Sequence, residues 1–191
     1  MPTQETLNQV RHPGQAVNDE AWIKALLHRS PFGVVATVNG DQPFTNTNLF
    51  VFDEERHCIY MHTAQEGRTR TNVEAQEKVC FTTFEMGRFL PTWEALEFSV
   101  EYAGVVCFGR AGLITDNEKA RSALQMLLTK YAPHMTPGKD YRPPIDEEIR
   151  RTSVYCIEID VWSGKRETAP DDYPGAYSYS AVTQKEGSHE V

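Results

Sequence analysis

A change of hydrophobic period after Pro31 constrains the fold of this chain more than any other feature. Upstream, apolar residues recur at helical spacing, whereas β-branched residues dominate downstream. Three strands separated by short turns are predicted, at Phe32–Val38, Pro43–Phe52 and Cys58–His62. The first turn, Asn39-Gly40, is a typical hairpin sequence. Strands joined by turns this short are antiparallel, which excludes a parallel nucleotide-binding sheet because parallel strands need long crossover connections.

Helices and further strands are predicted along the rest of the chain. The helices are expected at Asn18–Arg29, Gly67–Gln76, Asp116–Tyr131 and, as a single turn, Asp146–Arg151. The strands are expected at Val79–Phe84, Phe98–Ile114 and Thr152–Trp162, with loops at Met86–Pro91 and Pro133–Pro144. Glycines inside the long strand Phe98–Ile114 are typical of bends, bulges or close backbone approach. An open sheet would leave exposed edges, so the predicted fold class is mainly β, a small antiparallel barrel with helices packed outside.

The length of 191 residues fits one domain with extensions. We expect an N-terminal arm at 1–17, a barrel domain at 18–166 and a polar C-terminal tail at 167–191. The tail has no periodicity from Pro170 onward, so we expect it to be mobile or to lie over a partner subunit.

The charge balance excludes several classes of partner. Lys and Arg number 19 against 27 Asp and Glu, which gives a formal net charge of −8. Nucleic acids and anionic membrane surfaces are bound through clustered cations, so neither is expected as a partner. No apolar run approaches the ~20 residues of a membrane span. Because Met1–Val10 also lacks the pattern of a signal peptide, we expect a cytoplasmic protein.

The cysteines are expected to be core residues and not metal ligands. They are widely separated, form no CxxC pair and stand in apolar or β-branched stretches, at Cys58, Cys80, Cys107 and Cys156. Free cysteine packs as a small buried hydrophobe. No metal site is therefore predicted.

The turn between the third strand and the second helix carries the clearest functional signal. It reads YMHTAQEGRTR from Tyr60 and places Arg68 and Arg70 in the first turn of the helix. Cations stabilise the opposite end of a helix, so two arginines at the positive end favour an external anion. Backbone N–H groups, threonine hydroxyls and guanidinium groups would together bind a phosphate. The alternative is that Arg68 and Arg70 pair with Glu66 and Glu74 on the surface.

Several segments in a fixed order carry a family resemblance. They read IYMHTAQEGRTRTN, GRFLP, SVEYAGVVCFGRA and RTSVYCIEIDVWSGK. Over Asp19–Lys165 the chain resembles the FMN-binding split-barrel superfamily of pyridoxamine 5′-phosphate oxidase-like proteins, and within it the branch of the 5-nitroimidazole-resistance (Nim) proteins. The resemblance implies a six-stranded antiparallel Greek-key split barrel and a homodimer that binds FMN in two grooves at the subunit interface.

The same resemblance implies a set of cofactor-binding residues. The FMN phosphate would fall on His62, Thr63, Arg68 and Thr69. Relatives carry Arg-Lys or Ser-Lys at the start of this helix. This chain has Arg68-Thr69 there, so the lysine is missing, and Arg70 would substitute for it only in part. The polar edge of the flavin ring would fall on the backbone of Thr47, Asn48, Leu49 and Phe50. Tyr102 and Trp162 match positions on the side of the partner subunit.

His62 has two interpretations within the resemblance. In the Nim-like branch a histidine occupies this position, close to the flavin or the substrate. An imidazole there would stabilise negative charge on a reduced ring or supply a proton to a reduced nitro group, so His62 is the catalytic candidate. The alternative is a strand-end histidine that only hydrogen-bonds the cofactor or the backbone.

Three functions follow from these patterns. The first is an FMN-dependent oxidoreductase that passes electrons from NAD(P)H to a small acceptor such as a nitroimidazole, with FAD as the alternative flavin. The second is a flavin-binding carrier or sensor without turnover. The third is pyridoxamine-phosphate oxidation, although the segment from Trp162 to Arg166 lacks the arginine/histidine motif that grips the substrate phosphate in those enzymes.

Overall fold

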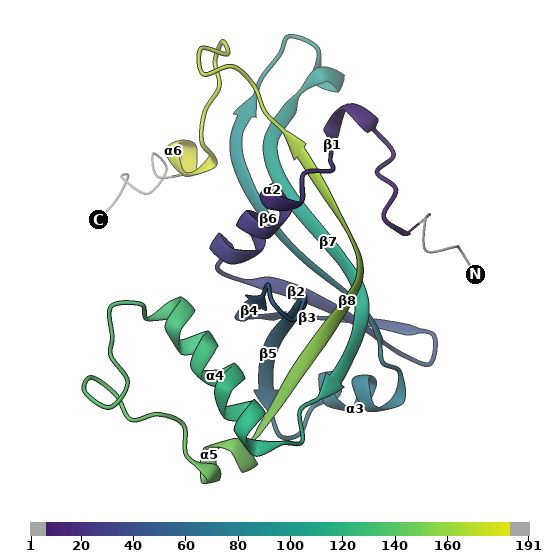
Figure 1. Ribbon diagram of the computed structural model, residues 1–191. Coiled ribbons are helices and arrows are strands. Elements are labelled where there is room, and N and C mark those ends of the chain that lie inside the picture. The colour runs from purple at the N-terminus through teal and green to yellow at the C-terminus, as the bar shows by residue number, and fades with distance from the viewer. Residues whose placement is uncertain (1–6, 184–191) are drawn as a thin grey trace, which may run out of the picture.

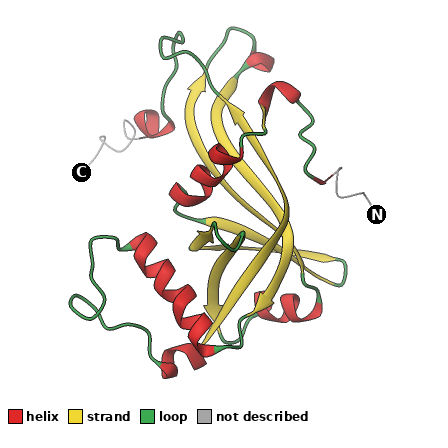
Figure 2. Ribbon diagram, viewed as in Figure 1, coloured by secondary structure: helices red, strands yellow, loops and turns green. Residues whose placement is uncertain are grey.

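The strands of the protein form one antiparallel sheet in the order β3-β2-β6-β7-β8-β5-β4, with the short strand β1 added beside β8. The computed structural model describes residues 7–183. Figure 1 shows the long strands β6, β7 and β8 running the length of the molecule, and Figure 2 shows the helices placed around the sheet. The predicted antiparallel, mainly β architecture is confirmed.

The elements follow the sequence prediction closely, with small shifts at their ends. The strands are β1 (Ala16–Val17), β2 (Gly33–Asn39), β3 (Gln42–Asn48), β4 (Phe50–Asp53), β5 (Cys58–Ala64), β6 (Lys78–Leu90), β7 (Ser99–Leu113) and β8 (Thr152–Glu167). The α-helices are α2 (Glu20–Arg29), α3 (Arg68–Ala75), α4 (Asn117–Tyr131), α5 (Asp146–Arg150) and α6 (Tyr179–Thr183). Short 3₁₀ turns are present at Pro13–Gln15 and Ala95–Glu97. None of the helices in residues 7–183 is long and apolar enough to cross a membrane.

The predicted strand Pro43–Phe52 is wrong as a single element, because it breaks at Leu49. β3 pairs with β2 and ends with Asn48 opposite Gly33, whereas β4 pairs with β5 and begins with Phe50 opposite Met61. The two halves therefore lie at opposite edges of the sheet and are joined only by the chain through Leu49. This interruption splits the barrel. It also leaves Leu49 half-exposed between two strands that it does not belong to.

Strand β6 extends further than predicted. β6 continues through the predicted loop Met86–Pro91 as far as Leu90, with a register shift between Met86 and Phe89. Arg88 holds this irregular stretch to β7 by a two-pronged ion pair with Glu101, whose N···O distances are both 2.8 Å. Glycine and charged residues there predict a loop, but cross-strand pairing overrides that local preference.

A bulge in β8 changes which residues face the barrel core. Phe108 pairs with Val161 and Gly109 with Ile159, so one residue of β8 is left out of the register. A Cβ at Gly109 would lie 2.0 Å from the carbonyl oxygen of Glu158, so only glycine allows the strands to approach this closely. Because of the bulge, Trp162 packs against the same barrel core as Ile159, although an odd number of positions separates the two residues.

The hydrophobic core has two parts, one inside the barrel and one between the sheet and α4. The first includes the fully buried Leu26, Phe50, Phe81 and Tyr155. The second packs Ala120, Ala123 and Leu127 of α4 against Val51, Tyr60 and Val154. Cys107 and Cys58 lie in the first and second part respectively, as core residues, while Cys80 and Cys156 are half-buried.

The described part of the C-terminal tail packs on its own chain. The guanidinium of Arg88 donates to the backbone carbonyls of residues 169, 170 and 171. Phe89 and Tyr177 exchange backbone hydrogen bonds of 2.7 and 3.2 Å, and their rings stack with centroids 5.5 Å apart. Residues 169–171 and Tyr177 are therefore held on β6 of their own chain, and a contact of the tail with a partner subunit stays a prediction. Residues 1–6 of the arm and 184–191 of the tail lie outside the described residues.

Candidate functional site

The N-terminus of α3 presents backbone donors that no side chain caps. Gly67 precedes the helix with a φ of +150°, a conformation that residues with a side chain rarely adopt. The N–H groups of the first turn have no acceptor within the helix. Together with the partial positive charge of a helix N-terminus, they form a site suited to an anion.

The two arginines of this helix have different surroundings. Arg70 Nε lies 2.9 Å from Glu74 Oε1, and Arg70 Nη1 donates to the carbonyl oxygen of Gln65 at 3.1 Å. Arg68 is exposed, with its guanidinium carbon 5.2 Å from the centroid of the Phe44 ring and no carboxylate partner among residues 7–183. Surface pairing therefore explains Arg70 but not Arg68. Arg70 holds the turn in place, and its role as a partial substitute for the missing lysine stays a prediction.

Alternate side chains of β3 face α3 and line the same site. Arg68 lies over Phe44, and Asn46 Nδ2 donates to the hydroxyl of the buried Thr69 at 3.0 Å. Asn48 is the next residue on this face of the strand. Its Nδ2 atom is buried and has no hydrogen-bond partner among the described residues. An unpaired buried amide is costly, so Asn48 offers a donor that a bound molecule would satisfy.

The other residues predicted along β3 and β4 differ from Asn48. Thr47 is exposed and points away from the α3 side of the strand. Leu49 is half-exposed at the break of the barrel. The Phe50 ring is fully buried, and both its backbone groups are engaged by the hydroxyl of Tyr131, at 3.0 Å from the N–H nitrogen and 2.9 Å from the carbonyl oxygen. Phe50 thus belongs to the wall behind the site.

The end of β5 brings His62 and Thr63 to the turn that precedes α3. The hydroxyls of Thr63 and Tyr155 lie 2.9 Å apart and share a hydrogen bond. His62 makes no side-chain hydrogen bond within residues 7–183. Surrounding protein atoms displace part of the water around the imidazole, which lowers the pKa of His62 below its ordinary value. The neutral imidazole therefore predominates at pH 7 and can donate or accept a proton.

Tyr102 and Trp162 lie apart from this cluster within one chain. Tyr102 pairs with Met86 and Glu167, and eight positions of β7 separate it from Arg110, which pairs with the start of β6 next to α3. At about 3.3 Å per residue this is roughly 26 Å. Figure 1 shows α3 at the opposite end of the long strands. Trp162 packs between Phe52 and His57, at centroid distances of 6.1 and 4.5 Å.

Tyr102 shares one property with Asn48. Its hydroxyl is buried and has no hydrogen-bond partner among the described residues. The ammonium of Lys165 lies 5.1 Å from the centroid of the Tyr102 ring. Tyr102 therefore keeps an unused polar group beside a cation, at a place far from α3 of the same chain.

The sequence interpretation missed two residues beside the candidate site. Asn46 bonds Thr69, and Tyr131 fixes the backbone where β4 begins. Asn46 could have been found from the alternation of threonine and asparagine in β3, which puts it on the face of Asn48. Tyr131 could not, because it is 81 residues from Phe50 and no local pattern links them.

Residues 19–166, most of the chain, match the protein family described as "Pyridoxamine 5'-phosphate oxidase". The chain belongs to this family. The resemblance of the short segments to pyridoxamine 5′-phosphate oxidase-like proteins is thereby confirmed. No curated protein matches the sequence.

Several solved structures are similar in fold to this chain. The flavocytochrome Anf3 from Azotobacter vinelandii superposes with a TM-score of 0.74 at 23% identity, over 92% of this chain and 78% of its own. A FAD and heme binding protein from Mycobacterium smegmatis gives a TM-score of 0.72 at 18% identity, over 89% of this chain and 80% of its own. A candidate 5-nitroimidazole antibiotic resistance protein from Bacteroides thetaiotaomicron gives a TM-score of 0.66 at 20% identity, over 79% of this chain and 86% of its own. The predicted split-barrel fold is confirmed.

Proposed function

We propose that this pyridoxamine 5′-phosphate oxidase family member is a flavin-binding oxidoreductase that holds the phosphate of FMN at the N-terminus of α3. The main support is the N-terminus of α3, which follows Gly67 and has no side-chain cap. Beside it lies Arg68, which pairs with no carboxylate in residues 7–183. A phosphate would satisfy both the backbone donors and the guanidinium. The names of a flavocytochrome and a FAD and heme binding protein among the similar structures support a flavin.

The residues along β3 fit the ring of such a cofactor. Asn48 carries a buried donor without a partner, and flavin rings have carbonyl and nitrogen acceptors along one edge. Thr47 lies on the edge strand β3 and Leu49 at the break between β3 and β4, and both would contribute backbone groups to the ring. Phe50 would support the site from behind, since its own backbone groups are already bonded to Tyr131.

We assign the acid–base role to His62 and an orienting role to the turn around it. When bound, the flavin supplies the redox chemistry, and the protein supplies position and protons. Partial loss of hydration lowers the pKa of His62 and so favours the neutral imidazole, whereas negative charge that develops beside the ring would favour the protonated form. Thr63 is fixed by Tyr155 and keeps the end of β5 in place. Thr69 would orient the phosphate through its hydroxyl.

A second copy of the chain would complete the site. Tyr102 lies far from α3 of its own chain, yet its buried hydroxyl has no partner within residues 7–183. In a homodimer, Tyr102 of one copy would approach the flavin on the other. Trp162 would then act indirectly, by packing on Phe52 and His57 near this surface. We further propose NAD(P)H as the donor, a small nitroaromatic as the acceptor and the cytoplasm as the location.

A visible absorption spectrum of the purified protein tests the flavin directly. We expect a flavin spectrum as purified, or one that develops after incubation with FMN, and bleaching after addition of NADPH under exclusion of oxygen. A colourless protein that takes up neither FMN nor FAD would overturn the proposal. A Soret band in the same spectrum would add a heme, as in two of the similar structures by their names.

Turnover separates the enzyme from a carrier and fixes the type of reaction. The proposal predicts NADPH oxidation that depends on a nitroimidazole. Full flavin occupancy without reduction by NADPH would favour a carrier or sensor. Oxygen consumption with pyridoxamine phosphate would instead favour the oxidase reaction that gives the family its name.

A further inference from the structure

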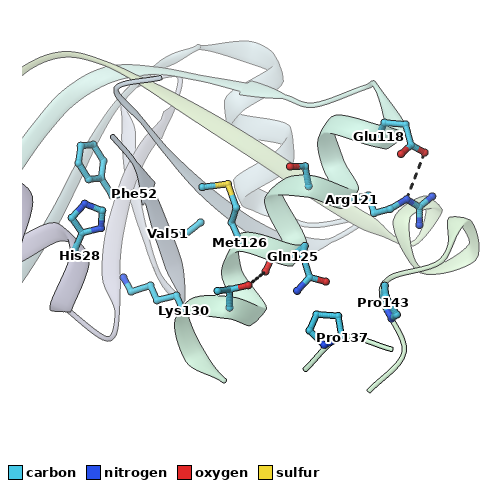
Figure 3. Close-up of a pocket in the computed structure, with 12 residues that line it drawn as sticks. His28, Val51, Phe52, Glu118, Arg121, Gln125, Met126, Lys130, Pro137 and Pro143 are labelled. Atoms are coloured by element: carbon cyan, nitrogen blue, oxygen red, sulfur yellow. Dashed lines mark hydrogen bonds and ion pairs between the residues drawn. The ribbon is translucent and has the colours of Figure 1, made fainter. Parts of the chain in front are cut away.

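An apolar hollow lies away from α3, between α2, β4, α4 and the proline-rich loop that follows α4. Its volume is about 790 Å³, within the range of small-molecule sites. Figure 3 shows Phe52 and His28 on one side, Pro137 and Pro143 on the other, and Met126 and Lys130 between them. None of the residues assigned to the flavin lines it.

Most polar groups along its walls are already engaged. Arg121 bonds the carbonyl of Pro144 and the carboxylates of Glu118 and Asp146. His28 Nε2 lies 3.4 Å from Glu54. Figure 3 marks the Glu118–Arg121 pair and the bond between residues 125 and 129 as dashed lines. These groups hold the walls together and offer little to a ligand.

Gln125 and Thr129 are engaged in the same way. The Gln125 amide donates to the hydroxyl of Tyr141 at 2.6 Å, and Thr129 Oγ1 donates to the carbonyl of Gln125 at 2.9 Å. The Tyr141 bond also fixes the proline-rich loop to α4. The walls are therefore preformed, which lowers the cost of binding a ligand between them.

Lys130 is the exception among these charged groups. Its ammonium lies 3.3 Å from the carbonyl oxygen of Leu27 and 3.7 Å above the centroid of the Phe50 ring. The Leu27 carbonyl needs this donor because the residue four positions on, Pro31, has no N–H. Neither contact supplies negative charge, and no carboxylate pairs with Lys130 within residues 7–183.

The setting of Lys130 disfavours its charge. Burial lowers the pKa of Lys130 to about 8. The other charged or titratable groups that line the hollow are His28 from α2 and Glu118 and Arg121 from α4, while β4 and the proline-rich loop contribute none. An ammonium has three N–H groups, of which the Leu27 carbonyl takes one and the Phe50 ring faces another. An anion would supply the missing countercharge.

We propose that this hollow binds a small carboxylate with an apolar body, whose carboxylate group pairs with Lys130 while its hydrocarbon part lies against Phe52, Met126 and Pro137. One unpaired cation in an apolar lining matches a single carboxylate better than a phosphate, which needs several donors. The apolar walls would bury the rest of the molecule. The proposal does not depend on flavin binding, because the two sites share no assigned residue.

Isothermal titration of the full-length protein with octanoate tests this assignment, with octanamide as the uncharged probe of the same shape. The titration is run with and without saturating FMN. We expect octanoate to bind the wild type, and Lys130→Met to weaken octanoate by about tenfold or more while changing octanamide by less than about threefold. Lys130→Arg keeps the charge and is expected to retain octanoate. Lys78→Met, at an exposed lysine that begins β6 and does not line the hollow, is the matched control and should bind as the wild type does.

A second variant keeps the test decisive if Lys130→Met unfolds. Met126→Trp fills the hollow without removing the charge and should abolish binding of both probes. Absence of octanoate binding to the wild type would overturn the proposal. Equal octanoate affinity in Lys130→Met, or unchanged binding in Met126→Trp, would overturn it as well. Displacement of octanoate by FMN would also overturn it, by moving the probe to the site beside α3.

Discussion

The start of α3 and the apolar hollow beside α4 are candidate anion sites of opposite construction. The first centres on a segment continuous in sequence, from His62 to Thr69, with β3 beside it, and its cation is one exposed guanidinium. The second is assembled from α2, β4, α4 and a distant loop, and centres on one half-buried ammonium. The cation of the local site is therefore an exposed guanidinium, Arg68, whereas the cation of the site made by packing is a half-buried ammonium, Lys130.

Arg68 is expected to show the largest effect, because it is the cation at the helix start without a carboxylate partner in residues 7–183. Arg68→Ala should weaken FMN by about tenfold to a hundredfold, the size of a lost charge-assisted hydrogen bond, and leave thermal unfolding unchanged. Quenching of FMN fluorescence on titration with protein measures the affinity. Arg150→Ala, at an exposed arginine of α5, is the control. Equal FMN affinity of Arg68→Ala and the control would remove α3 from the phosphate site.

Tyr131 connects the two regions and should show the next largest effect. Its hydroxyl lies within 3.0 Å of the Phe50 backbone and 2.8 Å from the Pro31 carbonyl, next to Lys130. Tyr131→Phe removes the hydroxyl that bonds the part-buried Phe50 backbone, so the free energy of unfolding should fall by about 1–2 kcal/mol. Urea unfolding followed by circular dichroism measures it. A stability equal to that of the wild type would show that the two regions are not coupled through this hydroxyl.

Asn48 should show a smaller effect, on binding alone. Its Nδ2 atom has no partner in the described residues, so Asn48→Ala removes no internal hydrogen bond. We expect FMN affinity to fall by about three- to tenfold, with thermal stability of the flavin-free protein unchanged or slightly raised. Asn46→Ala is the informative comparison, because it does remove a bond, the one to Thr69, and should lower stability. Loss of stability in Asn48→Ala without loss of FMN affinity would contradict the assignment.

Lys130 should give the smallest effect, as a dependence of stability on pH. Its pKa is about 8 in the folded protein against the ordinary 10.5, so between these values the unfolded chain binds more protons. Stability from this residue therefore rises as pH rises from about 8 to about 10.5. Because the side chain is partly exposed, the gain should be below about 1 kcal/mol. Urea unfolding of the wild type and of Lys130→Met at both ends of this range measures it, and a wild type that loses stability relative to the variant would contradict the sign.

The antiparallel fold and the start of α3 could be predicted from the sequence because both depend on short-range patterns. Asn39-Gly40 specifies a hairpin, and Asp116 caps α4 through its bond to the N–H of Lys119. Glycine at position 67 followed by Arg68 predicts a helix N-terminus suited to an anion. Each signal acts over a few residues, where backbone preference and capping decide the structure.

Tertiary structure alone decided three features: the break at Leu49, the bulge in β8 and the lowered pKa of Lys130. β3 and β4 are continuous in sequence, but they pair with strands at opposite edges of the sheet, and the local pattern cannot name those partners. Trp162 faces the core because of a bulge that forms against β7. Lys130 is an ordinary helical lysine in the sequence, and its lowered pKa arises from burial against chain segments about 80 to 100 positions away. Burial and long-range pairing are properties of the assembled molecule, which is why the sequence determined the architecture and one polar turn while packing decided the second site.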